Sequence, residues 1–222
     1  TTAGVKAFST TSGVVVDTLS PFTCYEFLVR TVCQPGDTSS WSAPFQFCTP
    51  CSPISAPYTE NWDALSSGSK DVGCFSSIED ASLSTSTFQG VTIQSSTFNG
   101  PISSPNYVEM DNGFSSPAPL LLVSPPTTDM TAGDKRVVFF ARSSFLTTPT
   151  TDVVVGTMSS PGDANTFNPL DTIVLDGSVF TRYVVDLTTA NGYNGTDQFF
   201  AFAHSQAANF RTLYIDDVVY EA

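Results

Sequence analysis

Two adjacent carboxylates, Asp216 and Asp217, interrupt an apolar run near the end of the chain, in TLYIDDVVYEA. The Tyr, Ile and Val residues around them favour a β-strand, whose side chains alternate between two faces. We therefore expect Asp216 to point inward and Asp217 to face solvent. An inward carboxylate needs a partner, because burying an unpaired charge is too costly. With 8 Lys and Arg against 21 Asp and Glu, basic partners are scarce. A hard cation and backbone amides remain as alternatives.

The residue types in the sequence give little support to a catalytic function. His204 is the only histidine, so a Ser or Cys nucleophile has one candidate base, and histidine-ligated zinc lacks its usual two or three ligands. Cys48 and Cys51 form a CTPC pair without the second ligand pair that a zinc site needs. Glu79 and Asp80 could be drawn as a glycosidase pair, but FSSIEDAS is typical of a polar turn. We predict that the chain is not an enzyme.

Composition points to a secreted β protein. The formal net charge of −13 repels nucleic acid and anionic lipid, so we expect neither as a partner. Only 13% of the 222 residues are charged, and Ser, Thr, Gly and Pro take their place. No apolar run approaches the roughly 20 residues that cross a bilayer. The start of the sequence does not resemble a signal peptide, and we interpret the chain as a mature or excised fragment.

The apolar pattern has the period of β-strands. Runs of strand length alternate or are fully apolar, and no long stretch has the helical spacing i, i+3, i+4, i+7. The sequence therefore predicts an all-β fold. The runs are YEFLVRTV, APFQF, RVVFFARS, TDVVVGTM, RYVVDL, DQFFAFAH and TLYIDDVVY.

Cysteine positions predict one disulfide and leave another open. In TCYEFLVRTVCQPGDTSSWSAPFQFC a hairpin brings Cys24 and Cys48 together at its open end, on the face opposite the aromatic residues. Cys33 lies at the turn end, roughly 24 Å from Cys48 along the strand, so these two should not pair. Cys51 and Cys74 are then a plausible second pair, with Cys33 free. The sequence alone does not settle this connectivity.

The positions of the cysteines along the chain also indicate the domain organisation. No cysteine lies beyond Cys74, and the stretch TPCSPISAP is rich in Pro and Ser without periodicity, as in a short stiff linker. We predict a first unit over residues 1–50, a linker over 51–57 and a larger domain over 58–222.

The first unit resembles the last strands of a fibronectin type III domain. The matching features are the Leu19-x-Pro21 turn, the YEFLVR strand and the Ser-x-Trp-Ser sequence around Trp41. The resemblance covers about half of such a domain. It implies a partial sandwich with an exposed apolar face, which a partner, a second copy or the neighbouring unit would cover.

Residues 55–222 resemble the cleaved-adhesin, MAM-like and choice-of-anchor jelly rolls of secreted bacterial surface proteins. The resemblance rests on a series of segments in the family's order and implies a two-sheet jelly roll that serves adhesion. The segments are APYTENWD, VGCFS, NYVEMDN, LLLVSPP, KRVVFFARSS, VVVGTMSSPGDANTFNPLDTIVL and LYIDDVV.

That resemblance also implies a structural calcium site between the first and last strands of the jelly roll. The family's Phe-Glu step is matched by Trp62-Asp63, with the shorter Asp in place of Glu, and the first Asp of its IDD step is matched by Asp216. Calcium takes six to eight oxygen ligands, so carbonyls of ALSSGSK and waters would complete the shell. Asp217 and Asp111 are further candidates. The alternative is that Asp63 caps a turn while Asp216 accepts hydrogen bonds from backbone amides.

Function is expected to be binding rather than catalysis. We predict an extracellular adhesion module of a larger secreted or surface protein, attaching to polysaccharide, to a surface protein or to itself. The alternatives are a carbohydrate-binding accessory module of a secreted hydrolase and a repeat unit of a filament or stalk. No motif marks a ligand site: Trp41 and Trp62 fit structural roles, and the loop aromatics Tyr193, Phe114 and Phe210 are more typical of loop anchors.

Overall fold

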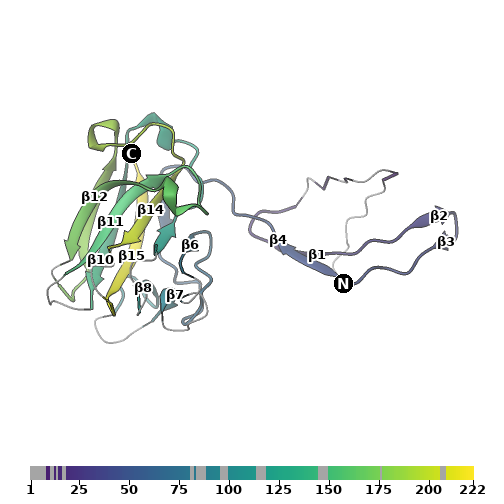
Figure 1. The fold of residues 1–222 in the computed structure, drawn as a ribbon, viewed down its shortest axis with the longest axis horizontal. Coiled ribbons are helices and arrows are strands. Elements are labelled where there is room, and N and C mark those ends of the chain that lie inside the picture. The colour runs from purple at the N-terminus through teal and green to yellow at the C-terminus, as the bar shows by residue number, and fades with distance from the viewer. Residues whose placement is uncertain are drawn as a thin grey trace. The chain divides into compact units, whose positions relative to one another are not determined.

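The computed structural model describes residues 9–10, 13, 15–16, 19–80, 83, 89–95, 100–113, 119–144, 150–175, 177–205 and 209–222. The chain divides into two compact units, residues 1–52 and 53–222, which we describe separately. Both units are built from β-strands, so the predicted all-β class is confirmed (Figure 1).

The first unit is a hairpin with the predicted register. Strands β1 (Cys24–Phe27) and β4 (Phe45–Cys48) pair antiparallel, which places Cys24 opposite Cys48. The disulfide predicted from this register is present. Tyr25 stacks on Phe47 on the other face, with ring centroids 5.9 Å apart. Short strands β2 (Val32–Gln34) and β3 (Asp37–Thr38) pair near the turn.

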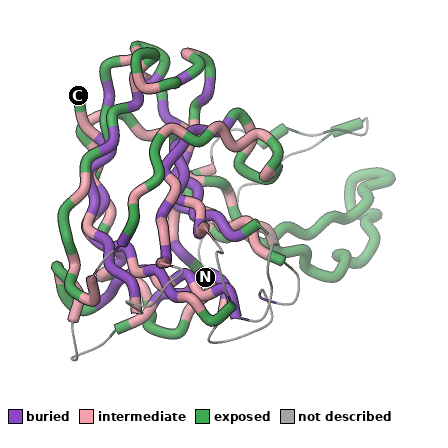
Figure 2. The backbone as a smooth tube through the Cα atoms, turned by 60° about the vertical axis from the view of Figure 1, so that its left-hand side comes forward, coloured by how far each residue is buried: buried purple, intermediate pink, exposed green. Residues whose placement is uncertain are grey.

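Most described residues of this hairpin are exposed (Figure 2), and several of them are apolar. Phe27, Val29 and Phe45 keep 47%, 60% and 58% of their surface accessible. Trp41 is also exposed, and the Arg30 guanidinium lies 4.5 Å from its ring centroid. The hairpin therefore has an apolar face but no buried core among its described residues.

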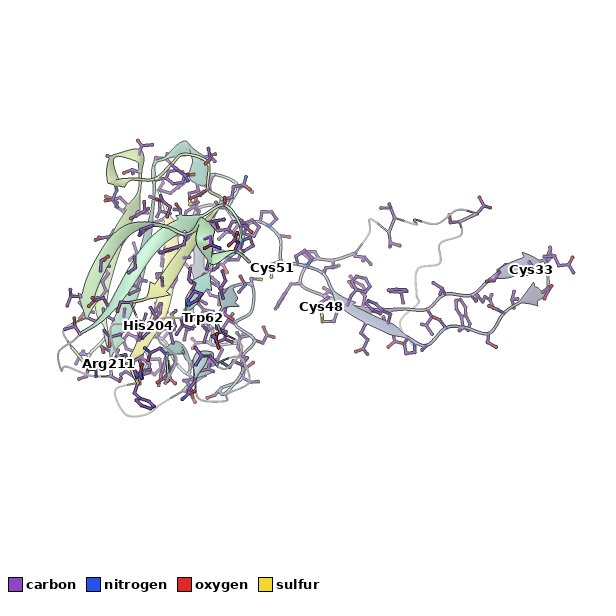
Figure 3. The ribbon with its side chains drawn as sticks, viewed as in Figure 1. Cys33, Cys48, Cys51, Trp62, His204 and Arg211 are labelled. Atoms are coloured by element: carbon purple, nitrogen blue, oxygen red, sulfur yellow. A yellow bond between two sulfur atoms is a disulfide. The ribbon has the colours of Figure 1, made fainter. Side chains whose placement is uncertain are left out.

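The remaining cysteines fall into two states. Cys51 and Cys74 are also disulfide-bonded, whereas Cys33 is free and exposed on the hairpin (Figure 3). The odd cysteine is therefore Cys33, as the spacing predicted.

The second unit is a sandwich of two antiparallel sheets. The β15 sheet has the order β13-β10-β15-β8-β7, with β5 pairing β15 at one end, and the β14 sheet has the order β12-β11-β14-β9-β6. The strands of the β15 sheet are β13 (Thr181–Leu187), β10 (Lys135–Ser143), β15 (Thr212–Glu221), β8 (Tyr107–Asp111), β7 (Gly90–Gln94) and β5 (Tyr58–Glu60). Those of the β14 sheet are β12 (Asn168–Leu175), β11 (Thr151–Met158), β14 (Phe199–His204), β9 (Leu121–Val123) and β6 (Ser76–Ile78).

Turns of 3-10 helix connect several of these strands. They are η1 (Met130–Ala132), η2 (Ala164–Thr166) and η3 (Thr189–Asn191). Within the part of the chain that the structure describes, no helix has the length and hydropathy needed to cross a bilayer.

The core lies between the two sheets and is rich in aromatic rings. Phe139 of β10 meets Phe202 of β14 edge to face, with centroids 4.9 Å apart, and Tyr220 of β15 stacks on Phe200 of β14 at 5.6 Å. Alternation explains this packing, because every second residue of each strand points to the facing sheet. Trp62, only 1% exposed, closes the core from the β5 side, so its expected structural role is confirmed.

Strand β15 changes partner at the acid pair. Residues Thr212 to Ile215 pair with β8, whereas Val218 to Tyr220 pair with β5. On its other edge, β15 has a β-bulge with one residue more than the opposing stretch of β10. Asp217 occupies the bulge with a left-handed φ of 46°. Bulges bend a strand and re-aim its side chains, so alternation breaks at this point.

The predicted linker needs correction at its second half. Residues 53–57 belong to the second unit. The Ile54 amide donates to the Pro126 carbonyl at 2.8 Å, and the Thr128 amide donates to the Ile54 carbonyl at 2.8 Å. The Ala56 amide donates to Asp129 Oδ2 at 3.1 Å. Pro and Ser richness predicted a short stiff linker between the units, but these long-range hydrogen bonds fix residues 54–56 against the sandwich.

Candidate functional site

Asp216 is a buried clamp for the segment that leads into β8. Its Oδ2 accepts hydrogen bonds from the amides of Ile102 at 2.7 Å and Ser103 at 3.3 Å, and its Oδ1 accepts one from the Asp217 amide at 2.8 Å. The side chain has no exposed surface. Burial raises the pKa of its carboxyl to about 7, although the amide bonds act in the opposite direction.

The position of Asp216 corrects one expectation. Ile215 and Val218 both belong to the core cluster between the sheets, so Asp216 points to the outer face of the β15 sheet. It is buried there because the chain around Ile102 covers it. The bulge then places Asp217 on the outer face as well, where alternation alone had sent the two acids to opposite faces. Two adjacent acids are tolerated because neither enters the core.

Asp63 holds the other end of the same segment. Its Oδ1 accepts a hydrogen bond from the Asn106 amide at 3.0 Å, and its Oδ2 accepts one from Asn61 Nδ2 at 2.9 Å. The Asn106 side chain donates in turn to the carbonyls of Trp62 and Leu65, at 3.1 and 2.7 Å. Asp63 and Asp216 thus tie one segment, residues 102–106, to the turn after β5 and to β15.

These contacts bear on the expected calcium ligands. A carboxylate offers about four acceptor positions, and amides take three of those on Asp216. The Leu65 carbonyl, one of the expected loop ligands, already accepts from Asn106. The described residues contain no group of three or more His, Cys, Asp or Glu side chains placed to hold a metal. The amide arrangement named as the alternative is therefore present, and calcium stays a prediction.

Asp217 lines a groove on the outer face of the β15 sheet. The groove has a volume of about 480 Å³ and runs across β13, β10, β15 and β5 to Asn61, the residue that follows β5. Its lining residues are Thr59, Glu60, Asn61, Val138, Phe140, Arg182, Asp217, Val218, Val219 and Glu221.

Strand register explains how this groove is assembled. Phe140 of β10 lies opposite Arg182 of β13 on one side and opposite Asp216 of β15 on the other. Two residues before Phe140 in β10, Val138 lies opposite Val219 of β15, and Val219 lies opposite Thr59 of β5. Partly exposed Phe140 and Val219 therefore form the floor above buried Val138, and polar residues lie on both sides of it.

The charged groups of the groove differ in how they are engaged. Glu221 pairs with Arg136 at 2.8 Å. Glu60 accepts hydrogen bonds from the Tyr58 hydroxyl at 2.9 Å and the Trp62 amide at 3.0 Å. By contrast, neither the Asp217 carboxylate nor the Arg182 guanidinium has a hydrogen bond or ion pair with any described residue. A free acceptor and a free donor thus face the same groove.

A second polar cluster on this face is closed by aromatic rings. The Arg142 guanidinium lies 3.8 Å from the ring centroid of Tyr214, 5.0 Å from that of Phe180 and 5.6 Å from that of Tyr107. Burial and the nearby Asp111 raise the pKa of Glu109 to about 7, against the attraction of Arg142. Arg142 is 6% exposed, so this cluster stabilises the sheet face and leaves little room for a ligand.

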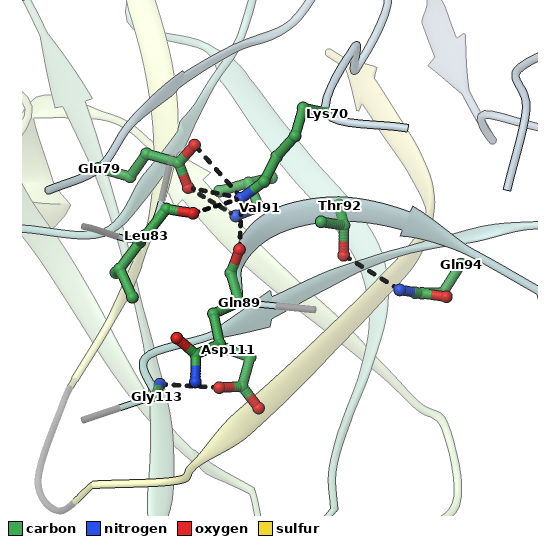
Figure 4. Close-up of polar contacts among 9 residues, drawn as sticks. All are labelled: Lys70, Glu79, Leu83, Gln89, Val91, Thr92, Gln94, Asp111 and Gly113. Atoms are coloured by element: carbon green, nitrogen blue, oxygen red, sulfur yellow. Dashed lines mark hydrogen bonds and ion pairs between the residues drawn. The ribbon is translucent and has the colours of Figure 1, made fainter. Parts of the chain in front are cut away.

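The catalytic candidates from the sequence are occupied by structural contacts. His204 is buried and its Nε2 lies 3.1 Å from the Arg211 carbonyl (Figure 3). Desolvation lowers the pKa of His204 to about 4, which keeps the ring neutral. Glu79 forms an ion pair with Lys70 at 3.3 Å and accepts a hydrogen bond from the Val91 amide at 2.9 Å (Figure 4). Asp111, which the sequence offered as a further calcium candidate and not as a catalytic residue, accepts hydrogen bonds from the Gly113 amide and the Thr212 hydroxyl.

The aromatic residues expected in loops differ in how far they are buried. Tyr193 is 3% exposed and its hydroxyl donates to the Asp197 carbonyl, so it is the expected loop anchor. Phe210 keeps 46% of its surface exposed, and Phe114 lies outside the described residues. Phe140 and Arg182, which line the groove, were missed at the sequence level. Alternation in RVVFFARS could have placed Phe140 outward, but nothing local indicated its neighbours.

Comparisons with known proteins show similarity at the level of the fold. No family model matches the chain, and no curated protein sequence matches it. Among solved structures, the K2 cleaved adhesin domain of Lys-gingipain is 17% identical, with a TM-score of 0.58, over 75% of this chain and 98% of that one. The K3 domain of Lys-gingipain from Porphyromonas gingivalis W83 is 20% identical, with a TM-score of 0.52 over the same shares.

A third similar structure belongs to an enzyme. An arabinose-bound GH51 α-L-arabinofuranosidase is 12% identical, with a TM-score of 0.53, and the match covers 72% of this chain but 25% of that one. Identities this low show a shared fold and nothing finer. The chain therefore has the fold of the cleaved adhesin domains, as the jelly-roll resemblance implied; its fibronectin-like and MAM-like parts stay predictions.

Proposed function

We propose that this chain is a non-catalytic, extracellular adhesion module of a larger secreted or surface protein, attaching to polysaccharide, to a surface protein or to itself. The observation that carries the proposal is the groove over β15, where partly exposed Phe140 and Val219 are bordered by the unengaged Asp217 and Arg182. A concave surface that combines apolar side chains with free polar groups is typical of ligand sites. The occupied state of His204 and Glu79 supports binding without catalysis.

Extracellular placement is supported by the cysteines. Cys24 and Cys48 form a disulfide and Cys51 and Cys74 are disulfide-bonded, a state that persists in oxidising compartments. A structural calcium ion held by Asp63 and Asp216 is part of the proposal, and its role would be to stabilise the sandwich.

The proposal is tested by attachment under flow. Beads coated with the chain through a C-terminal tag are passed over surfaces carrying neutral polysaccharides, acidic polysaccharides, collagen or the chain itself. Retention on at least one of these surfaces, above that of beads coated with the reduced and unfolded chain, is expected. Equal retention of folded and unfolded chain on every surface would contradict an adhesion function.

Self-association has its own supporting observation, the exposed apolar face of the hairpin at Phe27, Val29 and Phe45. If this face joins copies of the chain, as in a filament or stalk, sedimentation velocity should show a concentration-dependent increase in mass. The Phe27→Ser and Phe45→Ser changes should abolish the increase. A constant monomer mass in the wild type up to the highest soluble concentration would exclude this version.

A further inference from the structure

We infer that the groove over β15 binds a neutral pyranose unit, with Phe140 as the stacking surface and with Asp217 and Arg182 as the acceptor and donor for sugar hydroxyls. This inference rests on the proposed function and names the ligand class of its site.

The backbone at Asp217 is the first argument. A non-glycine residue with a φ of 46° is strained and persists only where its surroundings enforce it. The enforcing feature is the bulge at the point where β15 leaves β8 and joins β5. The consequence is that the Asp217 side chain lies beside the groove instead of alternating away from it. Asp is among the residues that tolerate this conformation best.

The floor and its borders fit a sugar ring. A pyranose has an apolar face of C–H groups and a rim of hydroxyls, so it needs an aromatic or aliphatic floor beside hydrogen-bonding groups. Phe140 is partly exposed and lies between Arg182 and Asp216 in the register, with Val138 and Val219 one step along. A volume of about 480 Å³ lies within the range of small-ligand pockets.

The two free charges suit hydroxyls on opposite edges of one ring, because Phe140 of β10 lies between β13, which carries Arg182, and β15, which carries Asp217. Each hydroxyl donates one hydrogen bond and accepts others. The Asp217 carboxylate can only accept and the Arg182 guanidinium can only donate, so a hydroxyl at each edge satisfies both. Charge-assisted hydrogen bonds of this kind are stronger than neutral ones.

Charge excludes acidic sugars. The groove contains Glu60, Glu221 and Asp217 against Arg182, and Arg136 is already engaged by Glu221. The whole chain has a formal net charge of −13, which repels a polyanion over several ångströms. A uronic acid would bring its carboxylate close to the carboxylates of Glu60, Glu221 and Asp217, whereas a neutral ring meets no such repulsion.

The test is affinity electrophoresis of the whole chain through gels containing soluble neutral β-glucan, galactomannan or xylan, and through gels containing alginate or polygalacturonate. We expect retardation by at least one neutral polymer. The Arg182→Gln and Asp217→Asn changes should each weaken it at least about tenfold, since each removes a charge-assisted hydrogen bond. Asn tolerates the left-handed backbone, so Asp217→Asn should leave the bulge intact. Phe140→Leu should weaken retardation as well.

The matched control is Asp171→Asn, which removes the same charge from an exposed position on β12 of the other sheet. It should be retarded like the wild type, and tryptophan fluorescence, to which buried Trp62 contributes, verifies that each variant is folded. Retardation that survives both groove variants would overturn the inference but leave adhesion standing, because another surface then binds. Retardation by the acidic polymers alone, or by no polymer, would also overturn it; bead attachment then decides separately whether adhesion holds.

Discussion

The clamp at Asp216 allows a quantitative test of how the acid pair is satisfied. Asp216→Ala would leave three amide donors without their acceptor, those of Ile102, Ser103 and Asp217. Each unsatisfied buried donor costs about 1–3 kcal/mol. Ile102 is 45% exposed, so its amide can regain water if the segment lifts away. The expected loss in the free energy of unfolding is therefore about 3–5 kcal/mol, below the full sum.

That loss should be visible in both equilibrium and local measurements. For a unit of this size, 1 kcal/mol shifts Tm by about 2–4 °C, so Asp216→Ala should lower Tm by about 6–20 °C. Urea unfolding followed by tryptophan emission gives the free energy, because Trp62 is buried in the fold whereas Trp41 is already exposed. Hydrogen exchange should show the amides of Ile102 and Ser103 protected in the wild type and unprotected in the variant.

The control lies one residue along. Asp217→Asn keeps the bulge conformation and removes no described contact of the Asp217 side chain, so it should change the free energy of unfolding by less than about 0.5 kcal/mol. A loss below about 1 kcal/mol in Asp216→Ala, or unchanged exchange at Ile102 and Ser103, would refute the clamp.

Chelation separates the clamp from calcium. If amides alone satisfy Asp216, excess chelator should leave the Tm of the wild type unchanged. If Asp63 and Asp216 hold calcium, chelator should lower the Tm of the wild type and of Asp217→Asn but not that of Asp216→Ala. The second pattern would restore the calcium site expected from the resemblance.

Four further predictions concern pH, on which there are two, the hairpin disulfide and the core. Because the folded pKa of Glu109 is raised to about 7, its ionisation destabilises the fold as pH rises from about 4.5 to 7, and Glu109→Gln should gain up to about 3 kcal/mol on the wild type over that interval. The pKa of His204 is lowered to about 4, so its stabilising neutral form is lost as pH falls from about 6.5 to 4. The free energy of unfolding that His204→Asn loses relative to the wild type should therefore shrink over that interval by a similar amount. Urea unfolding at several pH values checks both pH predictions, and parallel curves for variant and wild type would contradict them. Replacing Cys24 and Cys48 by Ser should destabilise the hairpin by about 3 kcal/mol, measured as faster proteolysis within residues 1–52, while equal rates would show that the bond adds nothing. Phe200→Ala should cost about 3–5 kcal/mol because its ring packs on Phe75 and Tyr220 in the core, whereas exposed Phe210→Ala should cost less than about 0.5 kcal/mol; similar losses in both would contradict the core assignment.

Local patterns in the sequence determined the strands and one cross-link. Alternation in YEFLV and FQF predicted which faces the hairpin presents, and that register placed Cys24 opposite Cys48. Both features depend on residues close along the chain, where the period of a strand and the length of a turn are sufficient. The resemblance added the jelly-roll fold, which the similar adhesin structures support.

Only the tertiary structure determined on which face of the sheet Asp216 and Asp217 lie. Alternation sent Asp216 and Asp217 to opposite faces, but the change of partner from β8 to β5 introduced a bulge that put both on the outer face. The clamp on Ile102 and the groove with Arg182 join segments that are tens of residues apart. Such pairings depend on the order of whole strands in a sheet. The free energy that favours one strand order comes from contacts throughout the core and not from any single sequence motif.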